Sequence, residues 1–261
     1  MRTAVALVLA LCAAQAAADA GAAPALDYDA ALAASQRAVG RTVGEASFVD
    51  SSRRLVSLAS YRGRPLVVQL AYTGCTQVCS TTTRVLDAAV RAAREALGAD
   101  RFEVVTIGFN APFDGPDAMA AFARQNGIRD PRWHFLSGDA TAIAAVARDL
   151  GFTWAPTAKG MDHISQITVV DAQGAVYRQV YGDRFEARML IAPLKELLTG
   201  QAQAAGLAGV WDRVKLFCTV YDPNTGGYRV NYSLFIEIFS GASVLAGIGA
   251  FLLAGRRGSR A

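Results

Sequence analysis

The sequence has little charge and no basic stretch in its middle part. Charged residues make up 18% of the 261 residues, and the formal net charge is only +4. Four arginines near the two ends account for that whole excess: Arg2, Arg256, Arg257 and Arg260. The remainder of the chain is therefore close to neutral. A chain without a basic face lacks the electrostatic footprint of a nucleic-acid-binding protein, so we expect no nucleic-acid partner.

Histidine and cysteine are also scarce. The chain contains two histidines and four cysteines, so any imidazole ligand must be His134 or His163. Cys12 lies in the N-terminal segment that we expect to be removed, which leaves Cys75, Cys79 and Cys218 in the mature protein. Chemistry that depends on sulfur or imidazole is thereby confined to very few positions.

The apolar content, 52% of residues, exceeds what one ordinary domain needs, and the surplus lies at the chain ends. Residues 1–20 combine Arg2, a short apolar core and an alanine-rich stretch, a pattern typical of a secretory signal peptide. Small residues at Ala18 and Ala20 offer cleavage sites. The sequence therefore predicts export from the cytoplasm.

At the other end, the sequence predicts a transmembrane helix over residues 233–254. Its apolar run from Leu234 to Ala254 would measure about 31 Å as a helix, which matches a bilayer core. The three arginines that follow place residues 255–261 in the cytoplasm, because positive residues beside a span stay on that side. We expect a single-pass protein of the cell membrane with its main domain on the periplasmic side.

Between these ends, the sequence predicts one folded domain over residues 45–200. An alanine-rich linker (21–44), expected to be a tether or a loose helix, precedes it, and a juxtamembrane segment (201–232) follows. Short apolar runs bounded by turn residues indicate strands, and longer amphipathic runs indicate helices. The predicted strands are 48–50, 55–58, 65–72, 102–109, 133–136, 164–170 and 175–181, and the predicted helices are 76–97, 116–125, 141–150 and 186–198.

This order predicts an α/β domain with a mixed sheet and helices on both faces. It is compatible with a thioredoxin-like fold, although periodicity alone does not select that fold.

The most informative motif is the pair Cys75 and Cys79, four residues apart where a buried strand meets a long helix. A spacing of four in a helical turn places both sulfur atoms on one side. The N-terminus of a helix stabilises anions, so we expect lowered thiol pKa values there. The pair suits either a shared metal ion or a disulfide, and a purely structural role is the simpler alternative.

His163 stands in the segment 157–163, predicted to be a loop that precedes a strand. In thioredoxin-like layouts this loop approaches the turn that carries the cysteines. Two thiolates and one imidazole form a soft, three-coordinate set that suits Cu(I) and also holds Cu(II). The predicted metal ligands are therefore Cys75, Cys79 and His163. Met161 could add a fourth soft ligand, but packing in the loop is the simpler interpretation.

The second histidine, His134, lies between bulky apolar residues in Trp133-His134-Phe135-Leu136. We interpret it as structural.

These motifs together resemble the Sco/SenC family. The resemblance rests on Tyr72-Thr73-x-Cys75-x-x-x-Cys79, on the segment from Trp133 to Gly138, and on Asp162-His163 leading into a strand and the Asp171–Gly174 turn. It implies a thioredoxin-like fold that binds copper through the two cysteines and the histidine. It also implies a metallochaperone that helps assemble the binuclear copper centre of cytochrome c oxidase. The implied partners are the copper-bearing subunit of that oxidase and other copper carriers or thiol-disulfide proteins.

The sequence departs from the family pattern at three places. Thr76 and Ser80 occupy positions where family members commonly have proline, which could shift the redox poise. The predicted anchor is C-terminal, whereas family members are usually anchored by an N-terminal helix. The segment 201–232 is additional and contains Cys218, which we expect to be a shielded thiol rather than a partner for another molecule.

Two functions from different classes remain open. A copper chaperone would use Cys75, Cys79 and His163 as ligands. A thiol-disulfide oxidoreductase acting on oxidase-assembly cysteines would use Cys75 as the attacking thiol and Cys79 as the resolving thiol. A peroxidase related to peroxiredoxins is disfavoured, because the threonine expected three residues before the reactive cysteine is replaced by Tyr72.

Overall fold

The structure is a computed structural model that describes residues 25–75, 78–158, 160–200, 219–222, 227–230 and 240. The chain divides into two units, residues 1–201 and residues 202–261. The first unit contains the expected α/β domain.

A seven-stranded mixed sheet forms the centre of this domain, in the order β2-β1-β5-β4-β3-β8-β9. The inner strands β3, β4 and β5 run parallel to one another, whereas β1, β8 and β9 join by antiparallel pairing. The strands are β1 (Ser47–Asp50), β2 (Leu55–Ser57), β3 (Leu66–Ala71), β4 (Glu103–Gly108), β5 (Trp133–Ser137), β8 (Gln166–Val170) and β9 (Val176–Tyr181). This is the mixed sheet that the sequence predicts.

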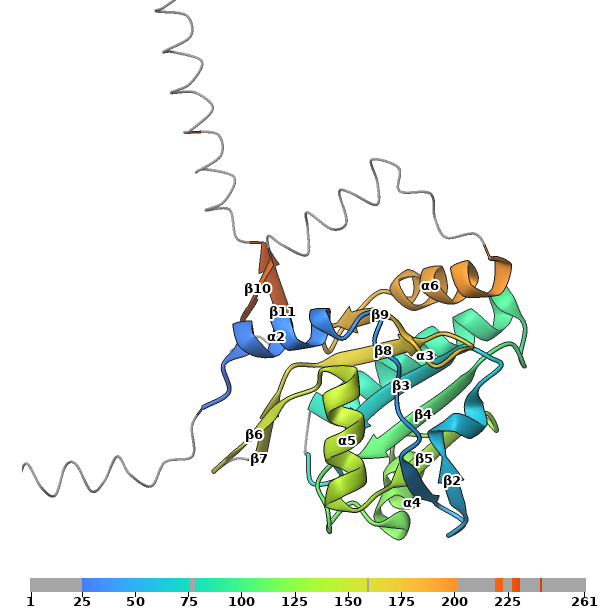
Figure 1. Cartoon of the computed structure of the whole chain (residues 1–261), viewed down its shortest axis with the longest axis horizontal. Helices are drawn as coiled ribbons and strands as arrows, with labels where there is room; N and C mark the ends of the chain where they lie inside the picture. Colours follow the sequence, from blue (N-terminus) through green and yellow to red (C-terminus); the bar gives the residue numbers. More distant parts are fainter. Residues whose placement is uncertain are drawn as a thin grey trace, which may run out of the picture. The chain divides into compact units, whose positions relative to one another are not determined.

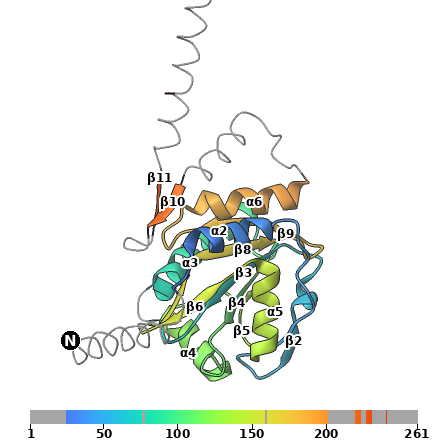
Figure 2. The same ribbon diagram turned by 60° about the vertical axis from the view of Figure 1, so that its left-hand side comes forward.

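Helices cover both faces of the sheet (Figure 1). Helix α5 (Ala140–Leu150) and helix α3 (Val78–Leu97) lie on opposite sides of the strands in Figure 1 and in Figure 2. Every residue of β3 and of β4 is buried, as expected for central strands covered on two faces. The domain has a thioredoxin-like α/β architecture. Its helices are α2 (Tyr28–Arg37), the 3-10 turn η1 (Leu58–Tyr61), α3 (Val78–Leu97), α4 (Pro116–Gln125), α5 (Ala140–Leu150) and α6 (Ala187–Thr199).

Local chemistry accounts for the helix boundaries. The Asp139 carboxylate caps α5 by accepting a hydrogen bond from the backbone N–H of Ala142, and Gly151 ends the helix with φ 66°. Pro116 begins α4, where its missing N–H leaves no hydrogen bond unmade. These signals are local in sequence, which explains why the predicted helix ends agree closely with the observed ones.

Two segments differ from the expectation. The predicted linker, residues 21–44, contains α2, which packs into the domain through buried Ala31 and through the Ser35 hydroxyl, 2.8 Å from the Tyr181 hydroxyl. Residues 157–163, predicted to be a loop, instead lie within an antiparallel hairpin formed by β6 (Trp154–Thr157) and β7 (Gly160–His163). Neither element shows a strong apolar period. A loose helix was one of the two expectations for 21–44, but its packing into the domain and the β6–β7 hairpin are visible only in the tertiary structure.

The described residues of the second unit include an antiparallel pair of strands, β10 (Thr219–Asp222) with β11 (Gly227–Val230). The predicted signal peptide, Cys218 and, apart from Ser240, the predicted span 233–254 lie outside the described residues. Within the part of the chain that the structure describes, no helix has the length and apolar character needed to cross a bilayer.

Candidate metal and thiol site

The two cysteines lie together at the carboxyl end of β3. Cys75 follows the strand and is half-buried, whereas Cys79 stands in the first turn of α3 and is 3% exposed. The backbone N–H of Cys79 donates to the Cys75 Sγ over 3.2 Å. The two cysteines are not joined in a disulfide. Cys75 is therefore the thiol that a partner molecule can approach first.

A buried polar network fixes the first turn of α3 against the sheet. The Thr83 hydroxyl donates to the carbonyl oxygen of Cys79 over 2.7 Å, and the Gln69 side-chain amide donates to the same hydroxyl over 3.0 Å. Gln69 lies on β3, and its carbonyl oxygen accepts from the Thr106 hydroxyl on β4. The position of Cys79 is thus tied to two central strands as well as to its own helix.

His163, the third predicted ligand, comes from the β6–β7 hairpin. It ends β7, and its Nε2 lies 4.0 Å from the Cys79 Sγ. Its Nδ1 lies 3.0 Å from the carbonyl oxygen of Ile164. A carbonyl only accepts, so Nδ1 carries the hydrogen and the neutral ring presents the Nε2 lone pair toward the sulfur. A backbone partner on the second ring nitrogen is the usual way in which a metal-binding histidine is oriented.

The electrostatics of the thiols differ from the sequence-based expectation. We expected the helix N-terminus to lower the thiol pKa, but the pKa of Cys79 is raised by hydrogen bonding with Cys75, by burial and by the nearby Cys75 charge. Two thiols in contact titrate as a pair, since the first negative charge opposes the second. At neutral pH the pair therefore retains a proton on Cys79.

Burial lowers the pKa of His163 below its ordinary value, and this effect outweighs the hydrogen bond to Ile164 and the charge of Cys75. The ring is consequently neutral at neutral pH. Neutral imidazole is the form that binds metal ions.

Cys79 and His163 lie close enough to bind one soft ion together. Two ligands of one ion, with metal–sulfur and metal–nitrogen bonds of about 2.3 and about 2.0 Å, lie up to about 4.3 Å apart, and the 4.0 Å between Cys79 and His163 falls within that limit. The donors are adjacent in pairs, Cys75 with Cys79 and Cys79 with His163. Among the described residues, no three His, Cys, Asp or Glu side chains form a complete metal cage.

Tyr72 joins the cysteine turn to the histidine hairpin. Its hydroxyl accepts a hydrogen bond from the backbone N–H of Met161 over 3.3 Å, and burial raises its pKa, so the hydroxyl remains protonated. A Cβ at Gly160 would lie 2.5 Å from that hydroxyl oxygen, and the φ of Gly160 is +125°. Glycine is therefore required where the hairpin meets Tyr72. In the sequence analysis Tyr72 belongs to the family motif and argues against a peroxidase, but the sequence does not reveal this contact.

Asp114 was not foreseen as part of the site. It is 3% exposed, and one carboxylate oxygen accepts from both the backbone N–H and the hydroxyl of Thr73, over 2.9 and 2.7 Å. The other oxygen accepts from the backbone N–H of Asn110. The carboxylate thus ties the turn before Cys75 to the loop after β4. A single aspartate in a polar loop carries no sequence signal of such burial.

Aromatic rings surround the remaining faces of His163. Phe109 and Phe152 each have ring centroids 5.4 Å from the imidazole, and Tyr72 lies at 6.3 Å. These rings shield much of the imidazole from water, and this burial is the main cause of its lowered pKa. Met161 packs against the same core, in keeping with its interpretation as a packing residue.

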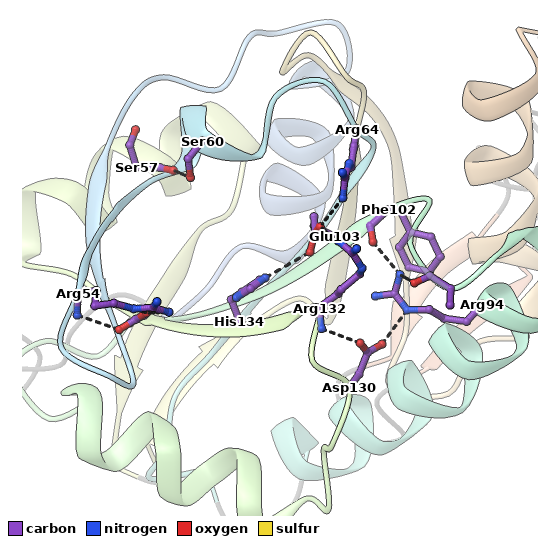
Figure 3. Close-up of polar contacts among 12 residues, drawn as sticks. Arg54, Ser57, Ser60, Arg64, Arg94, Phe102, Glu103, Asp130, Arg132 and His134 are labelled. Atoms are coloured by element: carbon purple, nitrogen blue, oxygen red, sulfur yellow. Dashed lines mark hydrogen bonds and ion pairs between the residues drawn. The ribbon is translucent and has the colours of Figure 1, made fainter.

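The other histidine lies at the opposite end of the parallel strands. His134 Nε2 is 3.3 Å from the Glu103 carboxylate, which also pairs with Arg64 and Arg132 over 3.2 and 2.7 Å (Figure 3). Glu103 begins β4, so this cluster closes the amino-terminal edge of the sheet, whereas the cysteines follow the carboxyl-terminal edge. His134 belongs to an ion-pair cluster away from the thiols.

Comparisons with known proteins agree with this architecture. The chain matches the family model described as SCO1/SenC over residues 34–199. No curated protein matches it.

Solved structures with the same fold include Bradyrhizobium japonicum ScoI with copper bound (25% identity, TM-score 0.51, covering 60% of this chain and 99% of that one). Arabidopsis thaliana ScoI, also with copper bound, is 18% identical, with a TM-score of 0.54 and coverage of 61% and 99%. BsSco, described as a member of the Sco family of cytochrome c oxidase assembly proteins with a disulfide switch, is 18% identical, with a TM-score of 0.55 and coverage of 61% and 95%.

Proposed function

Because the chain belongs to the SCO1/SenC family, we propose that it is a copper-binding metallochaperone. It holds copper with Cys75, Cys79 and His163 and delivers it to the copper-bearing subunit of a membrane cytochrome c oxidase. The observation that carries this proposal is the Nε2 of His163, 4.0 Å from the Cys79 Sγ and oriented by the Ile164 carbonyl.

An oriented, neutral imidazole beside two thiols supports metal binding because thiol-disulfide exchange does not require it. Soft thiolate ligands select Cu(I), and imidazole extends the set to Cu(II). The copper-bound Bradyrhizobium japonicum protein, 25% identical to this chain, supports copper as the cargo. Transfer would proceed by ligand exchange, with the half-buried Cys75 as the donor that a partner's ligands reach first.

A second function is favoured by the unequal exposure of the two thiols. A thiol-disulfide oxidoreductase needs one accessible attacking sulfur and one shielded resolving sulfur, which describes Cys75 and Cys79. The Cys75 thiolate would attack a partner disulfide, forming a mixed disulfide and releasing one partner thiolate. Cys79 would then lose its proton and attack the Cys75 sulfur, releasing the second partner thiol. The partner gains two electrons, and this protein is left with a Cys75–Cys79 disulfide.

Substitution of His163 distinguishes the two functions. We expect His163→Ala to weaken Cu(I) binding, and Cu(II) binding more strongly, because nitrogen donors matter more to the harder ion. The cysteine pair should still form a disulfide. Cys75→Ser and Cys79→Ser should each remove both properties, so neither cysteine variant distinguishes the roles. His134→Ala is the matched control, since it also removes one imidazole but lies in the Glu103 cluster.

The decisive measurement is oxidase activity in cells grown at limiting copper. A strain carrying His163→Ala should lose oxidase activity, and added copper should restore part of it by mass action, whereas the His134→Ala strain should retain activity. Full activity of the His163→Ala strain, with loss only in the cysteine variants, would refute copper delivery and favour the thiol-disulfide function.

The proposal includes a location on the periplasmic face of the cell membrane, after removal of residues 1–20 and anchoring by residues 233–254. A reporter active only outside the cytoplasm should work when fused after Gly200. A reporter active only inside should work after Ala261. A cytoplasmic signal after Gly200 would place the thiols in the wrong compartment for this function.

A further inference from the structure

An open groove of about 480 Å³ lies between α2 and α5, close to the candidate site. Small residues form much of its walls: Ala34, Ala144, Ala147 and Gly151. The end of α5 approaches α2 very closely (Figure 2), since a Cβ at Gly151 would lie 2.4 Å from the carbonyl oxygen of Ala34. The groove is therefore built by the close contact of two helices, one of which the sequence did not assign to the domain.

Three exposed arginines line this groove: Arg37, Arg41 and Arg148. Arg37 and Arg41 form no ion pair with any described residue. Arg148 lies 3.4 Å from Asp149 with its side chain 73% exposed, a geometry that contributes little energy in water. A guanidinium nitrogen of Arg41 donates to the backbone carbonyl oxygen of Arg148, which holds the Arg41 side chain against the end of α5. The groove thus carries a positive charge that the domain leaves largely unpaired.

The floor of the groove is aromatic and touches the candidate ligand. Phe152 and Trp154 line it, with ring centroids 5.8 Å apart. The Phe152 ring lies 5.4 Å from the His163 ring, and Trp154 pairs directly with His163 across the β6–β7 hairpin. A molecule seated in the groove would therefore rest on the layer of rings that supports His163.

The chain's own terminal segments do not complement this charge. Residues 1–24 contain one acidic residue, Asp19, and one basic residue, Arg2. Residues 201–261 contain three acidic residues (Asp212, Asp222 and Glu237) and six basic residues (Arg213, Lys215, Arg229, Arg256, Arg257 and Arg260). Neither segment carries the acidic charge that would match an arginine-lined groove, so charge complementarity favours an occupant from another molecule.

We propose that this groove docks an acidic segment of the protein that exchanges copper or thiols with Cys75 and Cys79. Carboxylates of that segment pair with Arg37, Arg41 and Arg148, and an apolar side chain packs on Trp154. The inference rests on the proposed function, which supplies the reason for a partner to dock here. The binding of the acidic segment itself does not depend on copper. Charge complementarity at such a surface sets partner choice and the rate of encounter.

Binding is tested on the full-length protein in detergent with a synthetic peptide of alternating glutamate and leucine, and a matched peptide with glutamine in place of glutamate. We expect the acidic peptide to change the tryptophan fluorescence, and Trp154→Phe to remove that change although Trp133 and Trp211 remain. The double variant Arg37→Glu/Arg148→Glu should weaken binding by about tenfold or more, and salt should weaken it in the wild type because exposed charges are screened.

The matched control is Arg124→Glu/Arg129→Glu, which makes the same charge change at two exposed arginines outside the groove. It should bind the acidic peptide like the wild type. Equal binding by both double variants, or equal binding of the glutamine peptide, would overturn the proposal. So would a change in the oligomeric state of the Arg37→Glu/Arg148→Glu variant without any effect of the peptide, since the occupant would then be a second copy of the chain.

Oxidase activity distinguishes this inference from the proposed function. The Arg37→Glu/Arg148→Glu protein should bind copper with unchanged stoichiometry, because neither residue is a ligand, yet its strain should show reduced oxidase activity at limiting copper. Normal activity in that strain beside a deficient His163→Ala strain would refute docking and leave copper delivery standing. A wild-type protein that binds no copper would refute the proposed function while the peptide test still decides the groove.

Discussion

Copper binding should release protons, because the cysteine pair retains one at neutral pH. The pKa of Cys79 is raised by its hydrogen bond with Cys75, by burial and by the Cys75 charge. Metal coordination requires the thiolate, so the bound ion must displace that proton. The pKa of His163 is lowered by burial, so the imidazole is already neutral near pH 7 and releases nothing there.

The magnitude follows from the number of protons released. If binding releases one proton per ion, the binding constant rises tenfold for each unit of increase in pH, as long as the pH stays below the thiol pKa. This factor corresponds to about 1.4 kcal/mol per pH unit. Between pH 6.5 and pH 8.0 the Cu(I) affinity should therefore rise by at least about thirtyfold, or by about 2 kcal/mol or more. Competition with a Cu(I) chelator, corrected for the chelator's own protonation, measures this slope. A pH indicator in weakly buffered solution should independently report at least one proton per copper at pH 7.

Variants isolate the source of the proton. His163→Ala should bind copper more weakly but keep a slope of at least about tenfold per pH unit, because the thiols still titrate. His134→Ala should leave both slope and affinity unchanged. An affinity that stays constant from pH 6.5 to 8.0 would mean that both thiolates exist before copper arrives, and would refute the reasoning about the coupled pair.

Four further outcomes are expected. Gly160→Ala should lower the free energy of unfolding by about 1–3 kcal/mol in urea, because its Cβ would lie 2.5 Å from the Tyr72 hydroxyl at a positive φ; unchanged stability would show that the hairpin does not depend on this contact. Asp114→Asn should cost about 1–3 kcal/mol in the same assay, since an amide NH₂ would face a backbone N–H where the carboxylate now accepts; an equally stable variant would contradict that account. In copper-free protein, stability should fall as the pH drops below about 6.5, because the unfolded chain protonates His163 before the folded chain does; a pH scan of His163→Ala should show a smaller loss. Cys218→Ser should leave one copper per domain, and loss of binding in the full-length variant would bring residues 201–232 into the site.

The sequence by itself determined the local elements and the identity of the reactive side chains. The turn between β1 and β2, the buried run of β3 and the caps of α4 and α5 depend on neighbouring residues, so their limits could be predicted closely. The pair of cysteines at the strand-to-helix junction likewise follows from local order. Because the chain has only two histidines, the predicted imidazole ligand was a choice between them, and both the loop position and the family resemblance favoured His163.

Only the tertiary structure decided how those side chains act on one another. The β6–β7 hairpin carries His163 to 4.0 Å from Cys79, although its short strands have no periodic apolar pattern. The carboxylate of Asp114 and the hydroxyl of Tyr72 acquire their roles from partners on other elements.

The pKa of Cys79 shows most clearly how the tertiary structure changes the chemistry of a side chain. Its position in the first turn of a helix predicts a lowered value, because the helix N-terminus favours an anion. Burial and a second thiol in hydrogen-bond contact act in the opposite direction and prevail. Both effects require that distant segments be folded around the residue: the strands beneath α3 exclude water, and the turn after β3 brings Cys75 into contact. Side-chain chemistry is encoded locally, but burial and charge coupling arise only when the sheet, α3 and the hairpin enclose the same few atoms.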